Sequence, residues 1–114
     1  MLAQANRLKK ELDITKVLKK GRSFKEGFLI LKSVKNERGQ TRFGFIVSKK
    51  VSNKANIRNR IRRQLREVIR LRVKQTNQAS DNLVIALKGI EKEKPLIIRE
   101  SLNNIITRAK LFND

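Results

Sequence analysis

The stretch from Ser48 to Lys74 is strongly amphipathic at helical spacing. Its apolar residues fall within roughly 120° of one another at about 100° per residue: Ile57, Ile61, Leu65, Val68 and Ile69. The opposite side is polar and basic, with Asn59, Arg63, Arg66, Arg70 and Lys74, and with Arg60 and Arg62 on its flanks. We therefore predict one helix with a buried face, for which Ser52, Asn53 and Asn56 are plausible N-caps.

Strand patterns lie on both sides of this helix. Phe28–Leu31 reads as a strand, Asn36–Gln40 as a turn, and Thr41–Ser48 as the returning strand. In the returning strand alternate residues share a face: Phe43, Phe45 and Val47 on one, and Arg42, Gly44, Ile46 and Ser48 on the other. Gly44 favours a β-bulge over a close approach of another backbone.

The flanking segments complete the predicted order. Residues 1–10 are expected to form an extended basic arm, followed by a short helix over Asp13–Lys20 that Gly21 ends. Thr76–Asn82 reads as a loop, and the nearly continuous apolar run Leu83–Leu87 as a buried central strand. Pro95 opens a final helix, whose apolar stripe is Ile98, Leu102, Ile105, Ile106 and Ala109.

A strand, a helix and an apolar strand in succession form a βαβ unit, which predicts that the two strands are parallel neighbours. The expected fold is a single α+β domain over residues 1–114, a two-layer sandwich of order α-β-β-β-α-β-α. The pattern gives bounds for only two of the first three strands.

The high positive charge of the chain indicates which class of partner it binds. The chain has a net charge of +19, and between Arg58 and Lys74 it holds eight Lys/Arg and one acid, Glu67. The like charges on such a helix repel one another unless an external polyanion supplies negative charge. Nucleic acid offers that charge at regular spacing. Trp and Tyr are absent, which disfavours a membrane surface. No apolar run is long enough to span a membrane and no signal peptide is recognisable, so we expect a cytoplasmic protein.

The chain offers little chemistry of its own. Cysteine and histidine are both absent, and the ten acids are scattered, so we predict no catalytic and no metal-ligating residues. A strand, rather than a second helix, precedes the basic helix, which disfavours a helix-turn-helix DNA reader. Arginine-rich helices that bind by phosphate position and shape suit structured RNA.

Specific motifs narrow this further. Arg58-Asn59-Arg60 is followed by Ile61-Arg62-Arg63-Gln64-Leu65-Arg66-Glu67 and preceded by Val47-Ser48-Lys49-Lys50-Val51. This arrangement resembles the RNR signature of the bacterial ribonuclease P protein subunit. The Arg7-Leu8-Lys9-Lys10 opening and the order of helices and strands match too, so the resemblance covers essentially the whole chain.

The resemblance implies a subunit that binds a large catalytic RNA and helps it remove the 5′ leader of precursor tRNA. Mg²⁺ ions held mainly by the RNA would perform the hydrolysis; the protein alone would bind no cofactor and need no obligate protein partner. It also implies a left-handed βαβ crossover through the basic helix, against the usual right-handed rule. The competing interpretation is a ribosomal or other structural RNA-binding protein without cleavage. A nuclease with its own active site is poorly supported, because no general base or carboxylate cluster exists.

The resemblance assigns site residues as well. It implies that the following residues contact the RNA subunit: Arg58, Asn59, Arg60, Arg62, Arg63, Arg66, Arg70, Lys49 and Lys50. It implies that the leader-binding cleft is formed by Ile14, Leu18, Leu31, Ile46, Ser48 and Arg7. The family often has aromatic residues at the first three of these cleft positions, so leader binding here should depend more on charge and shape than on stacking. Plain core packing explains Ile14, Leu18, Leu31 and Ile46 about equally well.

Overall fold

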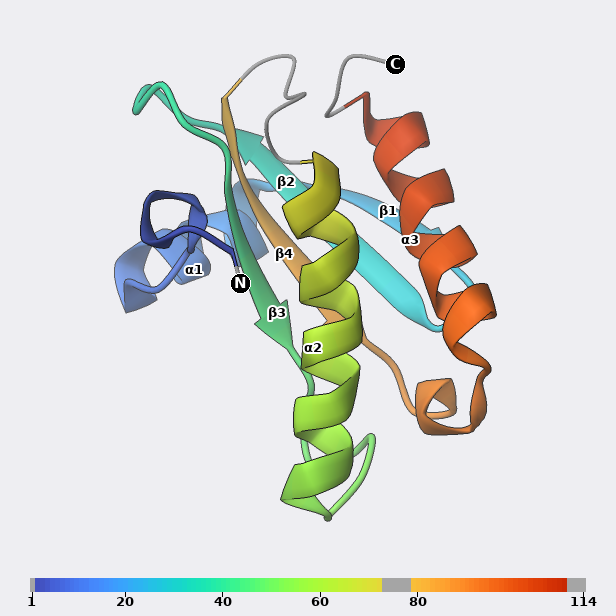
Figure 1. The fold of residues 1–114 in the computed structure, drawn as a ribbon. Coiled ribbons are helices and arrows are strands. Elements are labelled where there is room, and N and C mark those ends of the chain that lie inside the picture. Colours follow the sequence, from blue (N-terminus) through green and yellow to red (C-terminus); the bar gives the residue numbers. More distant parts are fainter. Residues whose placement is uncertain (1, 73–78, 111–114) are drawn as a thin grey trace.

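The computed structural model describes residues 2–72 and 79–110, and in that part of the chain four strands form one mixed sheet (Figure 1). Lys74 and the first part of the predicted 76–82 loop lie outside the described residues. The elements are, in chain order, η1 (Gln4–Asn6), α1 (Glu11–Lys20), β1 (Arg22–Glu26), β2 (Leu29–Lys35), β3 (Arg42–Ile46), α2 (Ala55–Arg72), β4 (Ser80–Ala86), η3 (Ile90–Lys92) and α3 (Pro95–Ala109). The predicted α-β-β-β-α-β-α order is confirmed, and β1 is the strand for which the pattern gave no bounds.

The strands lie in the order β1-β2-β4-β3. β3 and β4 are parallel neighbours, with Phe45 opposite Val84, so the predicted βαβ unit is confirmed. The expectation that β3 returns beside β2 is wrong, because β4 lies between them and pairs antiparallel with β2. Apolar residues on both faces of β4, such as Leu83 and Val84, suit a strand that is covered on both sides.

The crossover from β3 to β4 is left-handed, as the resemblance implied. In Figure 1, α2 lies in front of the sheet, β3 runs down the view, and β4 lies on its right. A right-handed connection with the helix in front would place β4 on the left.

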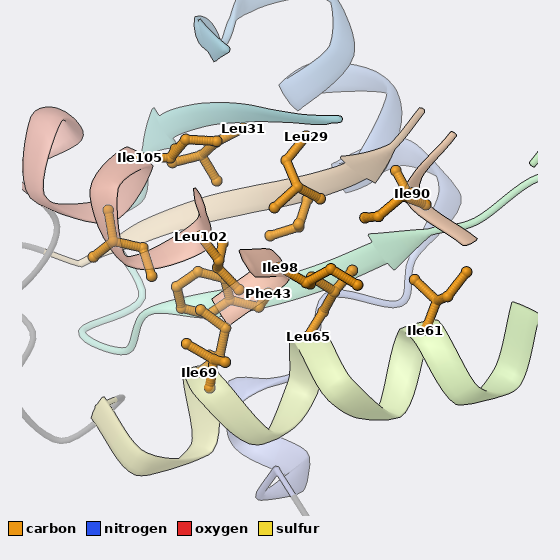
Figure 2. Packing of buried hydrophobic residues seen from close by; sticks show 14 of the residues in the cluster. Leu29, Leu31, Phe43, Ile61, Leu65, Ile69, Ile90, Ile98, Leu102 and Ile105 are labelled. Carbon is orange, nitrogen blue, oxygen red and sulfur yellow. The ribbon is translucent and has the colours of Figure 1, made fainter. Parts of the chain in front are cut away.

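The main core lies between the sheet and the helical layer of α2 and α3 (Figure 2). Ile61, Leu65 and Ile69 of α2 point toward the sheet, and Ile69 lies beside Phe43 of β3. The whole predicted stripe of α3 is buried. A smaller cluster on the other face of the sheet packs Val17 of α1 against Leu83. The α+β sandwich is therefore confirmed, with α1 covering part of the second face.

Residues 2–8 are anchored to the fold at Leu2 and Leu8, which differs from the predicted extended arm. Leu2 is 1% exposed and joins the main core, and Leu8 is buried on the α1 side. The chain continues the sheet beyond β3, since Arg7 bridges to Phe43 in parallel and the Leu8 N–H donates to the Phe43 carbonyl at 2.9 Å. Apolar residues at positions 2 and 8 explain the packing.

Gly44 lies in regular register opposite Leu83, so the predicted bulge is wrong. A Cβ at this position would lie 2.9 Å from Leu83 Cδ2 and 3.2 Å from the Leu8 carbonyl oxygen. The glycine therefore lets the backbone of the N-terminal segment pass close to β3. This close approach is the alternative to the β-bulge that we predicted from the sequence.

The end of the predicted 76–82 loop is also wrong, because β4 begins at Ser80. Asp81 and Asn82 are polar yet buried, and both have partners there. Asp81 accepts hydrogen bonds from Arg42 at 2.8 and 2.7 Å, and the Asn82 amide donates to the Arg42 carbonyl at 3.2 Å. Buried polar groups are tolerated when they are paired in this way.

Candidate RNA interface

Helix α2 lies on the sheet through its apolar stripe, which leaves its basic side toward solvent. Asn59, Arg60, Arg63 and Arg70 are exposed. Three further arginines are half-buried: Arg58, Arg62 and Arg66. The same helix therefore anchors the core and presents cations along most of its length.

The half-buried arginines at the start of α2 are held by the loop that precedes it. Arg62 donates to the Val47 carbonyl at 3.0 Å and to Asn59 Oδ1 at 2.8 Å. Arg58 donates to the Ser52 carbonyl at 2.9 Å. Each guanidinium has five N–H donors, so several remain for a ligand. These contacts orient the cations without neutralising them.

The helix is not neutralised from within the described part of the chain. Its one acid, Glu67, accepts hydrogen bonds from Arg70, and this pairing lowers the pKa of Glu67. None of the other arginines assigned to RNA contact pairs with a carboxylate among residues 2–72 and 79–110: Arg58, Arg60, Arg62, Arg63 and Arg66. The chain thus presents a ridge of uncompensated guanidinium groups, which fits a polyanionic partner.

The ridge continues on the side of the N-terminal segment. A depression of about 270 Å³ is lined by Arg66, Arg7, Lys9 and Phe45, among others. The guanidinium of Arg66 lies 6.0 Å from the centre of the Phe45 ring, within range of a cation–π contact. Arg7, predicted for the leader cleft, therefore lies on the α2 side of the sheet edge beside Arg66.

The face of the sheet that carries α1 presents a second, more apolar surface. Ile14 and Ile46 pack partly around the small cluster, and Leu18 is 41% exposed. Ile46 pairs with Ile85, which lines a hollow of about 510 Å³ together with Ser48, Lys50 and Lys88. The structure thus places Ile14, Leu18, Ile46 and Ser48 on one face. Lys49 and Lys50 are exposed in the loop that follows β3.

Leu31 does not belong to this surface. It is fully buried in the main core, on the face covered by α2 and α3. Its neighbours Ile30 and Lys32 alternate to the α1 face, where Lys32 Nζ donates to the Leu18 carbonyl at 3.2 Å. Sequence reasoning missed Lys32, because the four consecutive apolar residues before it, Phe28–Leu31, give no alternation from which to tell which strand positions face α1.

A buried ionic cluster ties α1 to the sheet. Arg42 of β3 pairs with Asp81 of β4 and, at 3.3 Å, with Asp13 of α1. Asn36 donates to Asp81 Oδ1 at 2.8 Å. Burial opposes ionisation of Asp81, but hydrogen bonds from Arg42 and Asn36 outweigh it, so that the pKa of Asp81 is lowered. The cluster sets where α1 lies over the sheet.

The described residues provide neither a metal-binding cluster nor a membrane-spanning helix. Among the described residues no group of three or more acidic side chains could hold a metal ion. In the same part of the chain no helix has the length and apolar content needed to cross a bilayer.

Comparison with known proteins gives a consistent result. The family model described as Ribonuclease P matches residues 2–110. The ribonuclease P protein component of Pseudanabaena sp. (strain PCC 6903) is 34% identical over 99% of this chain and 98% of the relative. That of Staphylococcus aureus (strain JH9) is 35% identical over 99% and 96%.

Solved structures agree with these matches. A mutant of the Staphylococcus aureus RNase P protein superposes with a TM-score of 0.89 at 32% identity, covering 96% of this chain and 92% of the other. The Thermotoga maritima RNase P protein gives a TM-score of 0.80 at 27% identity, over 90% and 96%.

Proposed function

The chain belongs to the ribonuclease P protein family and is a subunit of that ribonucleoprotein endonuclease, and from this premise we propose how it binds its RNAs. The ridge on α2 and the loop before it contact the catalytic RNA. The residues involved are Arg58, Asn59, Arg60, Arg62, Arg63, Arg66, Arg70, Lys49 and Lys50. The observation on which this rests is that five α2 arginines have no carboxylate partner among the described residues: Arg58, Arg60, Arg62, Arg63 and Arg66.

Arg7 joins this RNA-subunit surface in the proposal. Its Nε donates to the Leu2 carbonyl at 2.8 Å, which holds the side chain beside Arg66. A single phosphate chain that followed α2 would meet both guanidinium groups on the same side of the sheet edge.

The α1 face receives the leader of precursor tRNA. Ile14, Leu18 and Ile46 supply an apolar floor, and Ser48, Lys32 and Lys50 supply polar groups at its margin. Because this floor has no aromatic ring, contact depends on shape and on the lysine charges more than on base stacking. We do not include Leu31 in the proposed leader site, because it is buried on the face of the sheet that α2 and α3 cover.

The hydrolytic chemistry is assigned to the RNA. The described residues offer no carboxylate cluster for Mg²⁺, so the ions would be held by the RNA subunit and not by this chain. The protein contributes positive charge that brings two polyanions together. We place the assembly in the cytoplasm, with the catalytic RNA and precursor tRNA as the partners.

Reconstitution tests the proposal. The protein is mixed with a bacterial ribonuclease P RNA and labelled precursor tRNA at low Mg²⁺, and cleavage at the mature 5′ end is timed. We expect faster cleavage than with RNA alone. An unchanged rate at saturating protein would refute the assignment.

The leader surface has a matched pair of variants on one helix. Leu18→Asp alters the apolar floor, whereas Leu12→Asp changes a leucine that is 85% exposed elsewhere on α1. We expect Leu18→Asp to weaken the preference of the holoenzyme for precursor over mature tRNA, and Leu12→Asp to leave it unchanged. Equal effects of the two variants would remove Leu18 from the site.

A further inference from the structure

A groove of about 610 Å³ runs between α2 and α3, and it shares only Arg63 with the surfaces assigned above. Its floor is apolar and includes Val68, Ile98 and Pro95, with Leu71 at its edge, 67% exposed. Exposed leucines are common, but one beside an apolar hollow of this size marks a place where a ligand would cover apolar surface.

Arginines surround this floor. Arg63 and Arg72 come from α2 and Arg99 from α3. Arg72 donates to Asn103 Oδ1 at 3.0 Å, so it spans the two helices. Arg63 and Arg99 form no ion pair or hydrogen bond among the described residues.

The acids near the groove leave this charge in place. Glu67 is the one carboxylate among the lining residues, and it pairs with Arg70, which is not part of the lining. The lining therefore combines an apolar floor with two cations, Arg63 and Arg99, that have no ion-pair partner among residues 2–72 and 79–110. An occupant that fits it has a flat apolar body and an anionic group.

We propose that this groove binds an unpaired nucleotide of RNA. The base would lie on Val68 and Leu71, and its phosphate between Arg63 and Arg99. Unpaired bases stack on guanidinium planes and can cover apolar side chains, while their phosphates pair with arginine. The inference rests on the proposed function, because Arg63 belongs to both surfaces and would join them into one RNA path around α2.

An acidic protein segment is the other occupant to weigh. It would use the same cations, but its carboxylates would need positions matched to two arginines on different helices. RNA supplies phosphate on every nucleotide, and the rest of α2 already faces a polyanion. Charge complementarity thus favours RNA, and a protein occupant becomes an outcome of the test.

The test compares variants of the full-length protein for binding to a ribonuclease P RNA over a range of salt concentrations. Arg99→Ala removes a groove cation. Arg108→Ala removes the same charge from the same helix, but Arg108 lies outside the groove, where it donates to the Lys25 carbonyl of β1 and pairs with Glu26. We expect Arg99→Ala to lower affinity on the order of tenfold, as for one charge-assisted contact, and to reduce the salt slope by about 0.7–0.9. Arg108→Ala should do neither.

A second pair tests the apolar floor. Leu71→Ser changes a lining residue, whereas Leu96→Ser changes a leucine of α3 that is 55% exposed outside the groove. We expect only Leu71→Ser to weaken RNA binding, with no change of salt slope. Adenosine monophosphate at millimolar concentration should shift the methyl resonances of Leu71 and Ile98, and inorganic phosphate should not.

Several results would overturn the proposal. Equal affinities for Arg99→Ala and Arg108→Ala, confirmed with Arg99→Gln, would exclude an RNA contact at the groove. Concentration-dependent self-association that Leu71→Ser abolishes would assign the groove to a second copy of the chain. If the wild-type protein fails to stimulate cleavage, the proposed function falls. If it stimulates cleavage while both groove variants match their controls, only the groove assignment falls.

Discussion

Replacing Asp81 by Asn should destabilise the protein strongly at neutral pH. The side chains of Asp81 and Arg42 are 6% and 11% exposed, and two hydrogen bonds join them at 2.7 and 2.8 Å. Removing one partner of such a pair leaves an uncompensated buried charge, which typically costs about 3–5 kcal/mol. Asp13 remains 3.3 Å from Arg42, so we expect the lower end, about 3 kcal/mol. Domains of this size have only about 5–15 kcal/mol of stability in total.

The pH dependence follows from the direction of the pKa shift. Because the pKa of Asp81 is lowered in the folded protein, its contribution is fully present above the ordinary aspartate value, about 3.9. It is lost as pH falls through the lower folded value. The stability difference between wild type and Asp81→Asn should therefore be largest at neutral pH and shrink below about pH 4.

Urea unfolding followed by circular dichroism measures both effects. With an m-value of about 1–3 kcal/mol/M, a loss of 3 kcal/mol lowers the midpoint by roughly 1–3 M. Glu67→Gln is the control, because it removes an exposed ion pair with Arg70 and should leave the midpoint unchanged. A loss below about 1 kcal/mol for Asp81→Asn at pH 7, with no narrowing in acid, would refute the reasoning.

Three further variants test the fold and the interface. Leu2→Ala should cost about 2–5 kcal/mol in urea unfolding, because Leu2 is buried in the main core, whereas Leu12→Ala should cost little; equal losses would place Leu2 outside the core. Gly44→Ala should cost about 1–3 kcal/mol, because the added Cβ meets Leu83 and the Leu8 carbonyl; an unchanged midpoint would show that the N-terminal segment can move away. Arg63→Ala should reduce the salt slope of RNA binding by about 0.7–0.9, and an unchanged slope would place the side chain away from phosphate.

The parts of the fold that the sequence predicted are those with a clear period. The stripe of α2 and the stripe of α3 repeat over several turns, so their buried faces could be read directly. The parallel pairing of β3 and β4 followed from a helix lying between two strands. For these elements the local sequence pattern was sufficient to predict the structure, because their tertiary contacts agree with it.

The errors arose where distant partners decide the outcome. Ser80–Asn82 looked like loop, yet Asp81 enters the sheet because Arg42 pairs with it from β3. Leu31 follows three other apolar residues, and a run without alternation does not reveal which of its residues face α1. The position of Arg7 depends on the packing of Leu2 and Leu8 against β3 and the core, which no local period reveals.

The central place of β4 in the sheet has a consequence for how the chain folds. β2 and β3 have no direct pairing and are joined only through β4, which follows both of them and α2 in the sequence. During synthesis, α2 is therefore complete before the strand that closes the sheet beneath it has been made. Pairings between distant segments slow folding, so α2 should become fixed in place late, together with the sheet.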